Sequence, residues 1–190
     1  MLMLRANPPE TWLSKVISNL DAVLVDHAHL ERKAARSAIS LQRYRQLGAY
    51  IKELTNIAIE ELEHFKIVLN LLDERKIPFT QAVASPWISG LMTTVRKGRN
   101  EQVIDHLLCA AMIEGRSCEK FLLLRDALKS EDPALAKFYG DLVESEGNHY
   151  ASYLLMAKGI DESETNRRLE FYLELDAELV QRPSNLNILH

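Results

Sequence analysis

Two Glu-x-x-His pairs and two single glutamates stand on helical stretches of the sequence at positions that could bring their side chains together. The pattern Glu-x-x-His puts a carboxylate and an imidazole one turn apart on the same helix face, as one metal ion requires. The six residues are Glu31, Glu61, His64, Glu114, Glu146 and His149. Oxygen and imidazole ligands suit iron or manganese, and the set lacks the thiolates that favour zinc. No further catalytic side chain is predicted.

The glutamates interrupt apolar stripes that should face a protein core. One stripe runs Leu54, Ile57, Glu61, His64 and Val68, at steps of three and four residues, which is typical of the inward face of a helix. Four inward carboxylates would each destabilise the fold by several kcal/mol if unpaired, so cations should lie among them. Because the stripes carry no Arg or Lys at these levels, metal ions are the remaining candidates.

The spacing along the chain predicts that all six side chains lie at one level. Residues of an antiparallel hairpin face each other when they are equidistant from the turn. The midpoint between Glu31 and the first pair falls near residues 46–48, and that between Glu114 and the second pair near 130–132. Both stripes break at these points. The 30 residues from Glu31 to Glu61 return as 32 from Glu114 to Glu146, which indicates a two-fold internal repeat.

Chance is the competing explanation for the pairs. With 18 Glu and 6 His in 190 residues, about 0.6 Glu-x-x-His pairs are expected at random. Acids satisfied by other groups in the core therefore stay an alternative, although the conjunction of faces and levels favours metal. His27 is a candidate outer partner of the site or a packing residue. Glu60, Glu63 and Glu144 fall off the stripes and are predicted to be solvated.

Long helices are expected to position these residues. The first should cover residues 7–41 with Asn7 as its cap, the second residues 47–75 and the third residues 100–129. The 24 residues between the second and third, 76–99, are too many for a tight hairpin and indicate a crossover between two helix pairs.

The last two helices have the clearest sequence signals at their ends. Asp132 and Pro133 suit the cap and first position of the fourth helix, and Gly159 is expected just past its last turn. Asp161 should cap a fifth, shorter helix with Glu164 as its capping partner. The predicted fold is therefore all-α: a ferritin-like four-helix bundle with a long crossover and an additional C-terminal helix, with residues 1–190 as a single domain.

Composition narrows the possible partners. No apolar run approaches the roughly 18 residues of a membrane-spanning helix, and the first residues lack the features of a secretory signal. A cytoplasmic protein without a membrane partner is expected. A net charge of −4 and a pI near 5.9 argue against holding nucleic acid by overall charge. Cys109 and Cys118 match no zinc or redox spacing and are predicted to be core residues.

Iron is the preferred metal, because four carboxylates balance two ferrous ions and leave a neutral centre in an apolar core. Two iron ions can bind and activate dioxygen as a co-substrate. The ligands alone are equally compatible with hydroxylation of a C–H bond, oxidation of iron for storage, or turnover of peroxide.

Several runs of sequence, spread over nearly the whole chain, resemble the MiaE family of tRNA hydroxylases. They are Trp12-Leu13, residues 26–35 (DHAHLERKAA), residues 60–65 (EELEHF), residues 113–121 (IEGRSCEKF) and residues 144–150 (ESEGNHY). The resemblance implies a dinuclear non-haem iron monooxygenase that hydroxylates the isopentenyl group of 2-methylthio-N6-isopentenyladenosine beside the tRNA anticodon. It also implies dioxygen, an external electron donor such as a ferredoxin and its reductase, and ligand roles for the six residues, with Glu61 and Glu146 as bridges.

Local basic groups are the candidate RNA contacts, although each could equally be a solvated surface. One comprises Arg32, Lys33, Arg36, Arg43 and Arg45, and the other Arg96, Lys97 and Arg99. Two alternatives remain. A quinone-precursor hydroxylase would need a membrane-binding helix, for which the only candidate is the segment with Trp87, Ile88, Leu91 and Met92. Non-enzymatic, ferritin-like iron storage would predict a large hollow assembly.

Overall fold

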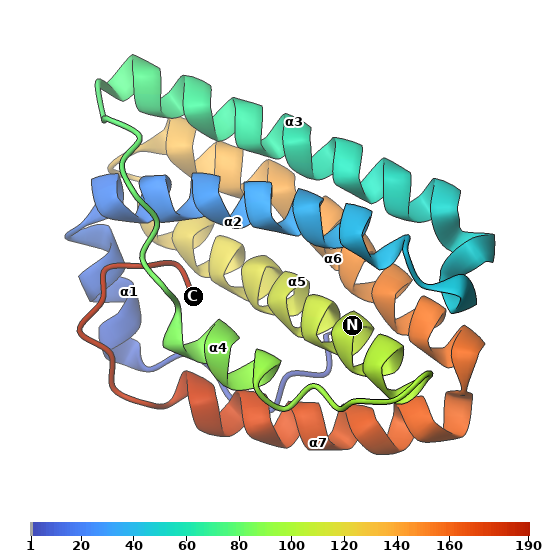
Figure 1. Cartoon of the computed structure of the whole chain (residues 1–190). Helices are drawn as coiled ribbons and strands as arrows, with labels where there is room; N and C mark the ends of the chain where they lie inside the picture. Colours follow the sequence, from blue (N-terminus) through green and yellow to red (C-terminus); the bar gives the residue numbers. More distant parts are fainter. Residues whose placement is uncertain (1) are drawn as a thin grey trace.

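The computed structural model describes residues 2–190, and every regular element in that part of the chain is helical. The elements are α1 (Glu10–Ile17), α2 (Leu20–Leu41), the 3-10 helix η1 (Arg45–Tyr50), α3 (Ile51–Arg75), α4 (Pro86–Met92), α5 (Glu101–Leu128), α6 (Pro133–Ile160) and α7 (Glu162–Val180). The prediction of an all-α four-helix bundle with a crossover and an added C-terminal helix is confirmed (Figure 1). The assignment of the whole chain to one domain stays a prediction.

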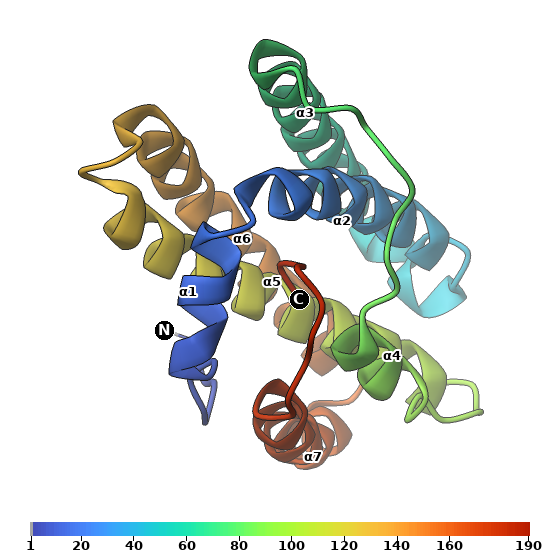
Figure 2. The same ribbon diagram turned by 90° about the vertical axis from the view of Figure 1, so that its left-hand side faces the viewer.

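Two antiparallel hairpins form the bundle. Helix α2 packs on α3, and α5 packs on α6. The crossover runs from the end of α3 past α2 to α4, on the other side of the bundle (Figures 1 and 2). Two apolar clusters fill the interior: one includes Leu54, Leu107 and Met156, and the other includes Val68 and Leu142. The predicted acidic level falls between these two clusters along every helix of the bundle.

Helix α5 is the central element and is covered on nearly all sides. Helices α1, α2, α4, α6 and α7 all contact it. One of its largest fully buried side chains is charged: Arg116 is 0% exposed and pairs through its guanidinium with Asp176 of α7, which is also 0% exposed. The Arg116 Nε lies 2.9 Å from Asp176 Oδ1. This ion pair attaches α7 to the bundle and directs the one arginine of the α5 core away from the glutamates.

The predicted caps of the last two helices are confirmed. Asp132 Oδ1 accepts a hydrogen bond from the backbone N–H of Leu135 at 3.0 Å, and Pro133 occupies the first helical position. Asp161 Oδ1 accepts one from the N–H of Glu164 at 2.9 Å. Each carboxylate satisfies an N–H group that has no partner inside the helix.

The prediction of one continuous first helix is wrong, because the chain breaks between α1 and α2. Asn19 leaves the helical conformation with φ −138° and ψ 39°. Its amide donates to the carbonyl of Lys15 at 2.8 Å, and the hydroxyl of Ser18 donates to that of Ser14 at 2.9 Å. Short polar side chains compete in this way with the helical backbone. The apolar period continues across the break, so hydropathy alone does not reveal it.

Three predicted helix ends are also corrected. Helix α1 begins at Glu10 without a side-chain cap, because its N-cap position is Pro9, which is extended with ψ 143° and has no polar side chain to accept a hydrogen bond. The second helix begins at Ile51 after the η1 turn. Gly159 lies inside the last turn of α6, where a Cβ atom would stand 2.2 Å from the hydroxyl of Tyr50. This glycine therefore lies where the Tyr50 side chain packs closely on α6, and it does not end the helix.

Among residues 2–190, no helix combines the length and the apolar character needed to cross a membrane. The apolar side chains of α4 point mainly inward: Trp87 is 7% and Leu91 0% exposed.

Candidate metal centre

All six predicted side chains meet in the middle of the bundle. One set of four consists of Glu31, Glu61, His64 and Glu146, and a second consists of Glu61, Glu114, Glu146 and His149. Within each set, one ligand atom per residue can be chosen so that all lie within 4.8 Å of one another. Glu61 and Glu146 belong to both sets. We call these six residues the carboxylate–histidine cluster.

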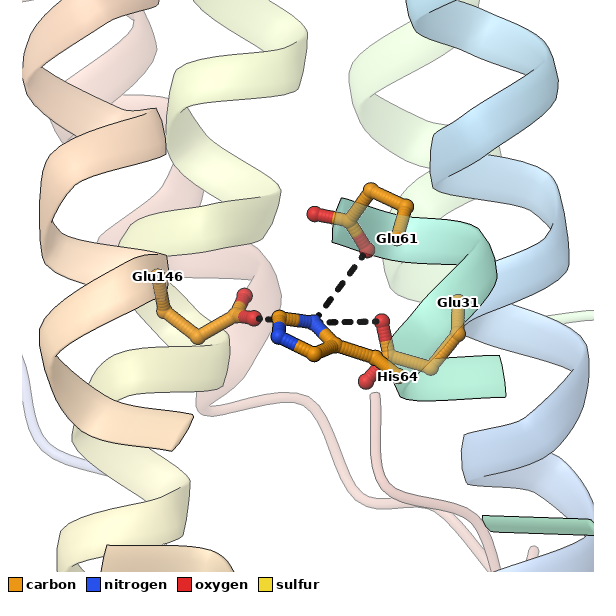
Figure 3. A group of neighbouring side chains, drawn as sticks. All are labelled: Glu31, Glu61, His64 and Glu146. Carbon is orange, nitrogen blue, oxygen red and sulfur yellow. Dashed lines mark ion pairs between the residues drawn. The ribbon is translucent and has the colours of Figure 1, made fainter. Parts of the chain in front are cut away.

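The imidazole rings present their Nδ1 atoms to the carboxylates. His64 Nδ1 lies 3.8 Å from Glu31 Oε2, 3.9 Å from Glu61 Oε2 and 3.6 Å from Glu146 Oε1. Figure 3 shows the ring between carboxylates from α2, α3 and α6. On the other side of the cluster, His149 Nδ1 lies 2.7 Å from Glu61 Oε1.

Many polar atoms of the cluster are buried without a hydrogen bond. They are both carboxylate oxygens of Glu61, Glu146 Oε1, and the Nδ1 atoms of His64 and His149. Although His149 Nδ1 and Glu61 Oε1 are close, their geometry is not that of a hydrogen bond. Within the described chain, no Arg or Lys nitrogen lies within 4.0 Å of the four glutamates. Buried acceptors facing one another in this way fit bound cations, because they would otherwise be strongly destabilising.

The carboxyl groups differ in proton affinity. Burial, reinforced by the neighbouring carboxylates, raises the pKa of Glu61 and Glu146 well above the ordinary range, and burial also raises the pKa of Glu114. Burial acts in the same direction on Glu31, but His27 outweighs it and lowers the pKa of that carboxyl. Three of the four acids therefore bind a proton more tightly in the metal-free protein than an exposed glutamic acid does, and metal ions would compete with these protons.

The metal-free protein is expected to lose stability relative to Glu61→Gln as the pH rises above the ordinary carboxyl value of 4.5. A raised folded-state pKa means that the folded state binds more protons than the unfolded state, so its stability falls with pH through that window. The lowered pKa of Glu31 changes the pH dependence of stability only below pH 4.5. Melting temperatures of both proteins between pH 5 and 8 would measure this. Added Mn²⁺ should raise the wild-type value most at high pH, and a wild-type advantage that grows with pH without metal would contradict the prediction.

Two side chains outside the cluster orient its members. His27, 0% exposed, has its Nε2 atom 2.5 Å from Glu31 Oε1. This contact is the one expected of an outer partner of the site, and that role stays a prediction. Glu60 accepts a hydrogen bond from His149 Nε2 at 2.8 Å, which leaves Nδ1 free to face the cluster. Glu60 was predicted to be merely solvated because it lies off the apolar stripe. Its contact with His149 crosses from one hairpin to the other, and no pattern within a single helix signals it.

The remaining predicted residues are the two cysteines and the two basic groups. Cys109 and Cys118 are buried free thiols, and burial raises the pKa of Cys109 to about 12, in agreement with a core role. In the second basic group, Arg96 is committed to ion pairs with Asp105 and Glu164. The first basic group lies along the C-terminal half of α2 and the turn after it.

Comparison with known proteins connects the whole chain to one family. Residues 1–190 match the family model described as tRNA-(MS2IO6A)-hydroxylase (MiaE). A tRNA 2-(methylsulfanyl)-N(6)-isopentenyladenosine(37) hydroxylase from Pseudomonas putida is 35% identical over 177 residues, covering 92% of this chain and 85% of the relative. A protein of the same name from Salmonella typhimurium is 37% identical over 225 aligned positions, covering 92% and 82% respectively.

A solved structure has nearly the same fold. It is described as protein 43 with aldehyde deformylating oxygenase activity from Synechococcus, and it superposes with a TM-score of 0.92 at 29% identity. The superposition covers 100% of this chain and 96% of that one. The ferritin-like class of the fold is thereby confirmed.

Proposed function

This chain belongs to the MiaE family of tRNA hydroxylases, and from that membership we propose that it is an oxygen-dependent dinuclear iron monooxygenase acting on tRNA in the cytoplasm. The substrate group is the isopentenyl chain of 2-methylthio-N6-isopentenyladenosine, the nucleoside in the names of the relatives. The observation that carries the proposal is the carboxylate–histidine cluster, with two overlapping ligand sets buried in the core of a protein from this family.

Each ligand set would hold one iron ion. Glu31 and His64 belong to the first set and Glu114 and His149 to the second, while Glu61 and Glu146 would bridge the two ions. Four carboxylates match the charge of two divalent ions, which supports a centre of two ions over a single cation. Oxygen and imidazole ligands suit iron or manganese. Bound iron would supply the redox chemistry that activates dioxygen, with electrons from an external donor such as a ferredoxin and its reductase.

The surrounding side chains control what reaches the cluster. The apolar clusters on both sides along the bundle exclude water from the reacting groups. His27 holds the Glu31 carboxylate in place, and the Glu60 carboxylate holds the Nε2 atom of His149, so that Nδ1 faces the cluster. Outer hydrogen bonds of this kind orient metal ligands and raise their basicity.

The distribution of ion pairs supports an RNA partner. Of the 13 arginines in the sequence, eight contact a carboxylate within 4.0 Å. The five without such a partner in the structure are Arg32, Arg36, Arg43, Arg45 and Arg99. Four of them, from Arg32 to Arg45, lie within 14 residues in the last part of α2 and the turn after it, although the protein is acidic overall. Unpaired cations gathered on one surface suit the phosphates of a nucleic acid.

A pocket of about 190 Å³ lies within this surface, and we call it the basic pocket. Lys33, Arg36 and Arg43 line it together with the hydroxyl groups of Ser37 and Ser40. Cations and hydroxyls side by side are ligands for phosphate oxygens. The basic pocket is therefore our proposed contact with the RNA backbone.

The quinone-precursor alternative loses its supporting feature. A membrane-binding α4 would need to expose its apolar side chains, but Trp87 and Leu91 are buried and Met92 is 41% exposed.

Nucleoside analysis of tRNA tests the proposed function. Cells that lack this protein should contain the prenylated adenosine without its hydroxyl group, and the wild-type gene should restore the hydroxylated form. The purified protein with ferrous iron, dioxygen and a reductant should carry out the same conversion on tRNA from the deficient cells. A tRNA nucleoside profile that is identical with and without the protein would contradict the tRNA assignment.

A further inference from the structure

The segment after α7, residues 183–190, turns back into the bundle and ends between α2 and α5 (Figures 1 and 2). The backbone N–H of Leu189 donates to Asp26 Oδ2 of α2 at 2.8 Å. The ammonium group of Lys120, on α5, donates to the carbonyl of Leu189 at 2.6 Å. The segment therefore fills the space between two helices that carry cluster residues.

The imidazole ring of His190 is held on one face and at both nitrogens. It stacks on Trp87 of α4, with ring centroids 5.2 Å apart and planes 26° apart. Its Nε2 atom lies 3.0 Å from the Ser117 hydroxyl, and its Nδ1 atom lies 3.3 Å from Lys120 Nζ. Burial, reinforced by Lys120, lowers the pKa of His190 well below its ordinary value, so the ring is neutral at neutral pH. Its binding site is thus built for a neutral, planar ring with polar nitrogen atoms.

This ring lies between a surface cavity and the carboxylate–histidine cluster. The cavity, of about 400 Å³, is lined by Trp12, Lys15, Trp87, Arg182 and His190, among others. On the inner side, Ser117 lies one helical turn from Glu114 along α5, an axial distance of about 5 Å. A ligand held in the cavity would contact the position of His190, which borders Ser117 and is thus about one helical turn from Glu114.

We infer that Trp87, Ser117 and Lys120 form a subsite for the heteroaromatic base of the substrate, and that His190 fills this subsite until the base replaces it. The inference rests on the proposed function and adds to it the place where the purine is held. A purine has the planar face and ring nitrogens that these side chains bind in His190. From the subsite, a five-carbon chain on the base has the length to reach Glu114.

Helix α4 contributes a residue to this subsite and a residue to the basic pocket. Trp87 is near the start of α4, and Met92, at the end of α4, lines the basic pocket. The two are about 8 Å apart along the helix axis. An RNA that placed a base in the subsite would have to extend along α4 for its phosphates to meet Arg36 and Arg43.

The test is the affinity of the nucleoside 2-methylthio-N6-isopentenyladenosine for the metal-loaded protein, followed by tryptophan fluorescence. His190→Ala should bind it at least about tenfold more tightly than the wild type, because the competing ring is gone. Adding Ser117→Ala to His190→Ala should weaken binding again by about fivefold, because one hydrogen bond to the base is lost. Dissociation constants of His190→Ala within twofold of the wild type would overturn the inference.

Asn187→Ala is the matched control for loosening of the segment, since the Asn187 side chain holds the same segment to Asn19 and does not contact the ring. It should leave the affinity unchanged, and an increase equal to that of His190→Ala would also overturn the inference. The tRNA hydroxylation assay is run on the same variants. If the wild type hydroxylates tRNA but the affinities do not follow the predicted order, the subsite is wrong and the function stands. If the affinities follow the order without hydroxylation of tRNA, the function is wrong and the subsite stands.

Discussion

Replacing Glu61 by alanine is expected to lower tRNA hydroxylation by at least about 100-fold and to reduce bound iron from two ions per chain to fewer than one. Glu61 is 0% exposed and belongs to both ligand sets, so its loss removes a ligand from each proposed ion. The same change should make the metal-free protein more stable, because a buried carboxyl group with unsatisfied oxygens is removed. Elemental analysis, single-turnover assays and thermal melting would measure the three effects.

Glu63→Ala is the matched control for this experiment. Glu63 is on the same helix, two residues away, but it is exposed and its ion-pair partner is the exposed Lys66. This variant should keep two iron ions and full activity. If Glu61→Ala also retained two tightly bound iron ions, the proposed bridging role of Glu61 would be wrong.

The double charge reversal Arg36→Glu/Arg43→Glu is expected to weaken tRNA binding on the order of 100-fold at moderate salt. Both arginines line the basic pocket, and neither has a carboxylate within 4.0 Å in the structure. Each phosphate contact that is lost should reduce the slope of log affinity against log salt concentration by about one, and therefore by about two for the pair. Filter binding of tRNA at several salt concentrations gives both quantities.

Arg125→Glu/Arg167→Glu changes the net charge equally and serves as the control. These arginines are already paired with Asp126 and Glu164. The control should weaken binding by less than about threefold and leave the salt slope within error of the wild type. Iron content should be normal in both double variants. Equal losses in the two would show that overall charge, and not the basic pocket, governs tRNA binding.

The bundle and the cluster were predictable because both depend on periodicity along single helices and on equal distances from two turns. Glu61 and His64 point inward because they continue the stripe of Leu54, Ile57 and Val68. The caps Asp132 and Asp161 were equally readable, since a cap acts within three residues. The break at Asn19 could not be predicted, because the apolar period of α1 continues in α2. The break is caused by a local competition between the Asn19 side chain and the helical backbone.

The sequence by itself thus determined the fold class, the family and the six candidate ligands, all of which follow from local patterns. Only the tertiary structure decided which residues support them. Glu60 reaches His149 from another hairpin, Arg116 meets Asp176 across 60 residues, and His190 stacks on Trp87 from the end of the chain. Such contacts join positions far apart in sequence, and their partners are set by how the helices pack in three dimensions. No repeating pattern along a single helix indicates which of these distant residues will meet.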